Sequence, residues 1–284
     1  MIEYSYKDKQ REIKIPSSLT SDLAELIGII VGDGHITLKH NKKYEIVIVG
    51  HITEDEDYHL SRVCYLFRSL FNLQYIPQIF RKDMALRGID VSSKAIVTFL
   101  VEEMGLSYGN KMQAEKLVPR IILNSPPETK AAFIRGVADT DFTLRFKRRK
   151  TVKNPFHYDP FIDGHFGNKQ FAYDVLNIIC SLGIHAYFLI TRKEKDGKKF
   201  IGYHISSSGK RNLQKWMETI CFNNYKHTTK YDIWDTYGFC PPYTTLKERE
   251  EILSGDAGLL KKYIMKMEQK PQILPSPLHT FAAP

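Results

Sequence analysis

The chain has 284 residues, and 43% of them are hydrophobic, which is enough for a packed core and excludes wholesale disorder. The 41 Lys and Arg residues outnumber the 32 Asp and Glu residues, and the formal net charge of +9 makes a polyanionic partner plausible. Residues 1–14 lack the apolar core of a signal peptide, and no apolar run approaches the ~20 residues of a membrane span. We therefore expect an intracellular protein, in the cytoplasm or nucleoid, without membrane contact.

The first half of the chain is expected to begin with a helix. Thr20 or Ser21 can cap it, and Asp22 lies in its first turn. The helix is expected to end at Gly32 to Gly34, because glycine lets the chain turn away there. The hydrophobic pattern then predicts strands over 36–39 and 44–52, a helix over 57–71, a hairpin over 74–91 and a helix over 93–104.

The second half of the chain repeats this order. Ser125 as N-cap, a proline at the first helical position and Glu128 at the third predict a capping box for a helix that runs to about Thr140. Strands are expected over 142–150 and 157–166, a helix over 170–182, a hairpin over 186–205 that turns at Asp196-Gly197, and a helix over 210–220. Each half is therefore predicted to run helix, two strands, helix, two strands, helix.

A near-matching stretch begins each half. The first copy is LIGIIVGDG, residues 26–34, and the second is IRGVADTDF, residues 134–142. In each copy a glycine, Gly28 or Gly136, stands five residues before an aspartate, Asp33 or Asp141, with apolar residues between them. The two aspartates are 141 − 33 = 108 residues apart. A repeat with this period indicates two similar halves that supply one carboxylate each.

The residues of the repeat predict a metal site where two helices meet. An aspartate at a helix C-terminus costs roughly 0.3–1 kcal/mol, so two at equivalent positions need a compensating interaction, which a divalent cation would supply. Glycine inside a helix costs about 1 kcal/mol relative to alanine. Matched at Gly28 and Gly136, it would let two backbones pack closely and bring Asp33 and Asp141 side by side. The alternative is a pair of ordinary buried helices with incidental glycines.

Basic residues gather on the predicted strands. Over residues 142–149 the alternation places Arg145, Lys147 and Arg149 on one face and three apolar side chains on the other. Such a ribbon suits the major groove of DNA, where arginine and lysine reach guanine edges and phosphates, although a solvated outer face has the same pattern. The candidate DNA contacts are Lys39, Arg81, Lys82, Arg87, Arg145, Lys147, Arg149, Arg192, Lys193 and Lys198.

The two motifs, in this order of elements, resemble the LAGLIDADG homing endonucleases over residues 23–252. The resemblance implies the α+β class, with two pseudo-symmetric αββαββα domains whose antiparallel sheets form saddles over a long DNA duplex. The expected division is an N-terminal domain over 1–104, a linker over 105–124, a C-terminal domain over 125–255 and a tail over 256–284. The first motif fits the family closely, whereas Phe142 stands where the family usually has glycine.

The resemblance also implies a metal-dependent DNA endonuclease. By motif position, Asp33 and Asp141 would hold Mg2+ or Mn2+ with help from the backbone at Gly32 and Thr140. The interface glycines would be Gly28 and Gly136. Family members hydrolyse both strands across the minor groove and leave short 3′ overhangs.

Two lysines resemble the basic residues that assist this chemistry in the family. Lys111 follows the first domain and Lys226 follows the second, and Lys230 competes with Lys226 for the role. Either amine could offset charge that develops at the phosphate while a metal-bound water attacks phosphorus.

Two other functions compete with this interpretation. Relatives of this kind can bind intron RNA as maturases, and a degenerate relative could bind DNA without cutting it. An intein is not expected, because the chain starts at Met1 without a Cys or Ser nucleophile and does not end in His-Asn. A single chain with two unequal halves is expected to act as a monomer on an asymmetric site.

Overall fold

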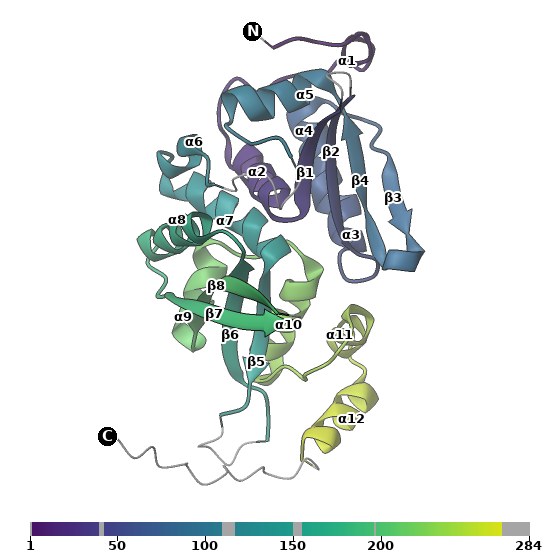
Figure 1. Cartoon of the computed structure of the whole chain (residues 1–284). Helices are drawn as coiled ribbons and strands as arrows, with labels where there is room; N and C mark the ends of the chain where they lie inside the picture. Colours follow the sequence, from purple (N-terminus) through teal and green to yellow (C-terminus); the bar gives the residue numbers. More distant parts are fainter. Residues whose placement is uncertain (1, 40–42, 110–116, 150–154, 196, 269–284) are drawn as a thin grey trace, which may run out of the picture.

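The chain folds around two four-stranded antiparallel sheets, one in each half, which confirms the α+β class. A computed structural model describes residues 2–39, 43–109, 117–149, 155–195 and 197–268. Figure 1 shows the two sheets in separate halves, with helices α2 (Ser21–Asp33) and α7 (Pro127–Asp141) side by side between them. The strand order is β1-β2-β4-β3 in the first sheet and β5-β6-β8-β7 in the second, so the halves share one topology.

The first half contains the predicted elements with small shifts in their bounds. After α1 (Tyr6–Gln10) and α2 come β1 (Gly34–Lys39), β2 (Lys43–His51), α3 (Glu56–Tyr58), a π-helical stretch (His59–Val63), α4 (Cys64–Phe71), β3 (Gln78–Arg81), a 3-10 turn (Lys82–Met84), β4 (Leu86–Ser92), α5 (Lys94–Thr98) and a second π-helical stretch (Phe99–Glu103). The predicted helix over 57–71 is thus one continuous helical run that changes its winding at His59.

The second half has the same order and then continues. Its elements are α6 (Arg120–Leu123), α7, β5 (Phe142–Lys147), β6 (Asp159–Phe166), α8 (Lys169–Ser181), β7 (Tyr187–Lys195), β8 (Lys198–Ser208), α9 (Lys210–Thr219), α10 (Tyr225–Tyr237), α11 (Leu246–Leu253) and α12 (Ala257–Glu268). Helix α12 lies within the stretch expected to be a tail, and residues 269–284 lie outside the described part of the chain.

The two motif helices begin differently. The Thr20 hydroxyl accepts a hydrogen bond of 3.2 Å from the Leu23 amide, so the predicted N-cap of α2 is confirmed. The capping box predicted for α7 is wrong, because its N-cap position is Pro126 and the Ser125 hydroxyl donates to the Ile122 carbonyl at 2.8 Å. The serine therefore completes the short helix α6, and Pro127 with its fixed φ starts α7.

Both motif helices pass directly into strands in extended conformation. Helix α2 ends at Asp33, within the predicted Gly32 to Gly34, and because Gly34 has φ −94° and Phe142 has φ −102°, neither position uses the left-handed conformation that favours glycine. Phe142 therefore fits the backbone where the family has glycine. The space for its ring comes from the paired strand, because a Cβ on Gly164 would lie 2.6 Å from the Phe142 ring.

Each sheet has one face against helices and one outward face. Ile36, Ile46 and Ile89 are buried on the helix side of the first sheet, and Leu144 and Ile162 are buried on that side of the second. The residues between them in register point outward. Among the described residues, no helix is both long and apolar enough to cross a bilayer.

Candidate active site

The glycines predicted to bring the motif helices together do lie at their crossing. A Cβ placed on Gly28 would overlap the Phe133 carbonyl oxygen, and one placed on Gly136 would overlap the Glu25 carbonyl oxygen. The two helix backbones are therefore very close, and the Cβ position built on Gly28 is only 3.1 Å from the Gly136 Cα. Any larger residue at either position would separate the helices.

The contacts across this crossing follow the repeat. Phe133 is the counterpart of Glu25 in the repeat, since 133 − 25 = 108. Gly28 contacts Phe133 and Gly136 contacts Glu25, so the two glycine contacts are equivalent under the repeat. At the C-terminal ends, a Cβ on Gly32 would overlap the hydroxyl oxygen of Thr140, and these two residues are also counterparts, since 140 − 32 = 108. Counterparts that touch each other lie on the pseudo-twofold axis. Asp33 and Asp141, the next residue in each helix, therefore flank this axis.

A buried carboxylate ties the two helices together above the aspartates. Glu25 of α2 is fully buried and accepts two hydrogen bonds from Arg62, of 2.8 and 2.7 Å. From the second half it accepts hydrogen bonds of 3.1 Å from the Arg135 guanidinium and 2.8 Å from the side chain of Asn223. A buried charge with this many donors is compensated, and donors from both halves share that role.

A second buried carboxylate, Asp139, anchors the segment that precedes α10. It accepts hydrogen bonds of 3.1 Å from the Asn223 amide and 3.0 Å from the Asn224 amide. Burial raises the pKa of Asp139 to about 7, although these amide donors favour the charged form. Asp139 stands two residues before Asp141, so the start of α10 is fixed to the last turn of the motif helix.

Lys226 lies beside this anchor and is paired with the first half. Its ammonium is 2.8 Å from a carboxylate oxygen of Asp55. The same oxygen accepts a hydrogen bond of 2.7 Å from the side-chain amide of Asn224. Burial lowers the pKa of His59, and the neighbouring carboxylates of Asp55 and Asp33 oppose this change. His59 therefore lies within electrostatic range of both the motif aspartate and the Lys226 pair.

The competing lysine, Lys230, lies one turn further along α10. Burial, with the nearby Arg249 guanidinium, lowers its pKa to about 8. The charges that act on Lys230 include Glu54 and Lys226, so the two lysines share one environment. The structure places neither on the outward face of a sheet.

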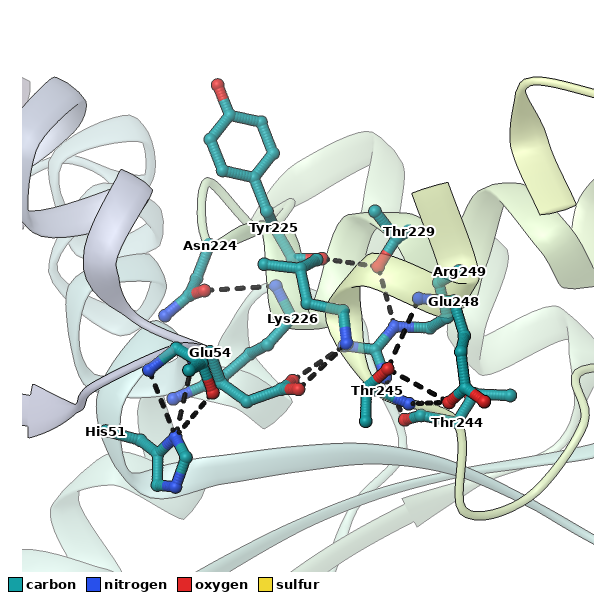
Figure 2. A network of polar contacts seen from close by, with 12 residues as sticks. His51, Glu54, Asn224, Tyr225, Lys226, Thr229, Thr244, Thr245, Glu248 and Arg249 are labelled. Carbon is teal, nitrogen blue, oxygen red and sulfur yellow. Dashed lines mark hydrogen bonds and ion pairs between the residues drawn. The ribbon is translucent and has the colours of Figure 1, made fainter. Parts of the chain in front are cut away.

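A further contact between the halves runs from Glu54 to α10 and α11. Glu54 accepts 2.7 Å from the fully buried Arg249 and 2.8 Å from the Leu246 amide. Arg249 also donates to the Thr229 hydroxyl at 2.9 Å and to the Thr244 carbonyl, so its guanidinium is compensated on several sides. Figure 2 shows Glu54 of the first half beside Arg249 and Lys226 of the second.

We expect Glu54→Gln to lower the free energy of unfolding by about 1–2 kcal/mol at pH 7, because it removes a charge-assisted hydrogen bond to a buried arginine. Burial raises the pKa of Glu54, but the hydrogen bond and charge of Arg249 outweigh it, and the net pKa is lowered. The contribution is therefore complete above the unfolded-state pKa of about 4.3 and is lost as the pH falls through the lowered folded-state pKa.

Urea unfolding of both proteins between pH 3 and pH 7 measures this difference. The matched control is Glu103→Gln, at an exposed position. A difference between Glu54→Gln and the parent that persists unchanged at low pH would contradict the assignment.

The predicted basic face of the second sheet is present on β5. Arg145 is half exposed and forms an ion pair with Asp163, and both Arg145 and Lys147 lie over the Phe161 ring, Lys147 at 3.3 Å from its centroid. Arg149 follows the strand, is exposed, and donates 3.0 and 2.9 Å to Asp159. The Arg149 pair is solvent-accessible, so a phosphate could compete for this guanidinium at small cost, whereas Asp163 is buried and holds Arg145 more firmly.

The other predicted contacts are scattered. Arg81 and Lys82 are exposed at the β3–β4 turn, and Arg192 is exposed on the β7–β8 hairpin. Arg87 differs, because it shares the helix side of its strand with buried Ile89 and pairs with Glu56 at 2.8 Å. Lys39, Lys193 and Lys198 lie in strands, but their side chains are outside the described residues, and Lys111 falls in the undescribed segment 110–116.

The outward face of the first sheet carries acid as well as base. Asp90 is opposite Val47 in register, Glu45 stands two residues before Val47 on the same strand, and Glu45 forms an ion pair with Lys43. Burial and the neighbouring Glu45 raise the pKa of Asp90 to about 6. Both outward faces therefore carry paired acids and bases, at different positions in the two sheets.

The donors at the helix ends suit a hard divalent cation. Carboxylates and backbone carbonyls are oxygen ligands, and Mg2+ keeps several waters, so two protein carboxylates are sufficient. Within 2–39, 43–109, 117–149, 155–195 and 197–268, no group of three or more His, Cys, Asp or Glu side chains is arranged to hold a metal. The remaining ligands of a cation here would come from water and phosphate.

Comparison with known proteins finds similar sequences and similar solved structures. No protein-family model matches the chain. Curated relatives include one of the subunits of the A-type ATP synthase from Pyrococcus abyssi, 29% identical over 72% of this chain and 17% of the relative. A tRNA-splicing ligase RtcB from Pyrococcus furiosus is 22% identical over 73% of this chain and 21% of the relative. A replication factor C small subunit from Methanocaldococcus jannaschii is 27% identical over 75% of this chain and 10% of the relative. The chain thus spans about a fifth or less of these relatives.

The similar solved structures belong to the family that the motifs resemble. The homing endonuclease I-DmoI, in complex with DNA and Mn, is 20% identical with a TM-score of 0.48, covering 72% of this chain and 98% of its own. A point mutant of I-SmaMI is 11% identical with a TM-score of 0.49, covering 89% and 96%. The N-terminal LAGLIDADG domain of WhiA is 12% identical with a TM-score of 0.41, covering 77% and 91%.

Proposed function

We propose that this protein is a site-specific endonuclease that hydrolyses both strands of a long, asymmetric DNA site with a divalent metal. The observation that carries the proposal is the contact of Gly32 with Thr140, its counterpart, at the ends of α2 and α7. This contact sets Asp33 and Asp141 on either side of one axis, and two scissile phosphates on opposite strands need the same pseudo-symmetry.

The residues at the axis have distinct roles in this proposal. Asp33 and Asp141, with the backbone at Gly32 and Thr140, hold Mg2+ or Mn2+ from opposite halves. Such a cation activates water as a nucleophile and stabilises the leaving 3′ oxygen when it is bound. The ammonium of Lys226 offsets negative charge that develops at the phosphate.

The outward sheet faces supply the DNA contacts in this proposal. Arg145, Lys147 and Arg149 contact phosphates or guanine edges on the second half, and Arg81 and Lys82 do so on the first. One chain provides both halves, so a monomer is sufficient. The curated relatives are named for activities unrelated to one another, and this chain matches only a small part of each. This supports a domain whose activity differs from the activities in those names.

Removal of divalent metal is expected to stop cleavage and leave DNA binding largely intact. The test incubates the full chain with plasmid DNA that carries a randomised insert, with Mg2+, with Mn2+ or with EDTA, and sequences the cut ends. Cut sites that share one long sequence, and that appear only with metal, support the proposal. Binding to structured RNA without any DNA cleavage would overturn it in favour of a maturase.

A further inference from the structure

We infer that Asp55, which belongs to the first half, is a positioning residue that holds Lys226 of the second half at the active site. The inference rests on the proposed nuclease function and adds a residue that neither motif contains. Asp55 lies in the connection between β2 and α3, just before the helical run 56–71 begins.

The ion pair is enclosed. The Asp55 side chain is 8% exposed and the Lys226 side chain is 17% exposed, and the ammonium lies 2.8 Å from the carboxylate. Surface ion pairs hold long side chains weakly, but an ammonium taken out of water stays charged only beside a partner. Burial raises the pKa of Asp55, and the charge of Lys226 with other donors outweighs it, so the carboxylate stays ionised.

The carboxylate is itself held in place. One oxygen accepts 2.8 Å from the His51 amide and the other accepts 2.7 Å from the Asn224 side chain. Gly50 makes room for it, because a Cβ there would lie 2.8 Å from an Asp55 oxygen. Contacts within the first half therefore orient the Asp55 carboxylate independently of Lys226.

Asn224 joins this pair to the second motif helix. Its side chain donates 2.7 Å to Asp55 and 3.1 Å to the Asp139 carbonyl, and its own oxygen accepts 3.1 Å from the Lys226 amide. The ammonium of Lys226 is therefore fixed relative to the last turn of α7, which ends at Asp141. The second half offers no equivalent, because Gly167 and Asn168 alone join β6 to α8.

The experiment compares Asp55→Asn with Asp57→Asn, the same substitution at an exposed carboxylate two residues along. Single-turnover cleavage of a selected DNA site is measured at saturating protein, together with the DNA Kd and Tm. A reacting group displaced by about 1 Å can cost about 10²-fold in rate. We expect Asp55→Asn to slow cleavage by about tenfold or more with Kd nearly unchanged, and Asp57→Asn to match the parent.

A double-mutant cycle with Lys226→Met separates positioning from general stability. If Asp55 acts through Lys226, the double variant cleaves no more slowly than Lys226→Met alone. Additive losses, or a parental rate for Asp55→Asn, would overturn the inference while leaving the nuclease proposal in place.

A second readout does not depend on cleavage. Acetic anhydride labelling followed by mass spectrometry measures the reactivity of the Lys226 amine in the folded protein. We expect labelling to be slow in the parent and faster in Asp55→Asn. If the parent cuts no DNA at all, the nuclease proposal fails, and an unchanged labelling rate would also exclude Asp55 as the group that holds the amine.

Discussion

Asp33→Asn and Asp141→Asn are each expected to abolish double-strand cleavage, with a rate at least about 10³-fold below the parent. Asparagine keeps the shape of aspartate and loses the charge that would hold a divalent cation. Both residues flank the axis at which Gly32 meets Thr140, so neither carboxylate can substitute for the other half. DNA affinity should change little, because the basic outward faces of the sheets are untouched.

Single-turnover cleavage, gel-shift affinity and circular dichroism of the full chain measure these effects separately. Asp57→Asn is again the matched control, because its carboxylate is exposed. Cleavage at the parental rate by both motif variants would show that the paired helix ends are not the catalytic centre.

Gly136→Ala is expected to destabilise the protein by about 2–3 kcal/mol and to slow cleavage. An alanine in a helix normally stabilises it by about 1 kcal/mol relative to glycine. Here the new Cβ would overlap the Glu25 carbonyl oxygen and lie 2.8 Å from the Ile29 amide, so the helices must move apart. Overpacking of this kind costs typically about 1–3 kcal/mol, and here backbone atoms rather than flexible side chains must give way.

Gly28→Ala should behave like Gly136→Ala, because its Cβ would meet the counterpart carbonyl of Phe133. The matched control is Gly167→Ala, where a Cβ has nothing within 4 Å. Urea unfolding gives the free energies, and cleavage at saturating protein gives the rates. Motif variants as stable as the control would contradict the close crossing.

The helix crossing was predictable because its determinants are local and repeated. Gly28 and Gly136 are unfavourable inside isolated helices, so their recurrence at one spacing indicates a contact that requires them. The succession of helices and strands along the chain also followed from alternation and turn residues, as at the turn predicted for Asp196-Gly197, where β7 ends at Lys195 and β8 begins at Lys198, although Asp196 itself lies outside the described residues. These signals lie within a few residues of one another.

The supports of the candidate site could not be predicted in this way. Glu25 and Asn223 are 198 residues apart, and Asp139 and Asn224 are 85 apart, so no local pattern links them. One weak signal was available, since Glu25 is the one polar residue within residues 23–32 of this helix. Arg87 was predicted as a DNA contact but lies on the helix side of its strand. Strand alternation separates the two faces of a strand, but it does not say which face the helices cover.

The connection between β2 and α3 reaches the other half of the molecule, whereas among the described residues its counterpart between β6 and α8 does not. The connection between β2 and α3 carries Glu54 and Asp55, and both bind side chains of α10 and α11. No described hydrogen bond or ion pair runs the other way, from the shorter β6–α8 connection at Gly167 and Asn168 to the first half. A chimera that grafts this second half onto a relative's first half would therefore bring Gly136 alone to the helix crossing, and would lack the first-half carboxylates Glu25, Glu54 and Asp55 unless they were transplanted as well. Domain shuffling between such proteins has a defined minimal exchange unit, and it does not coincide with the repeat.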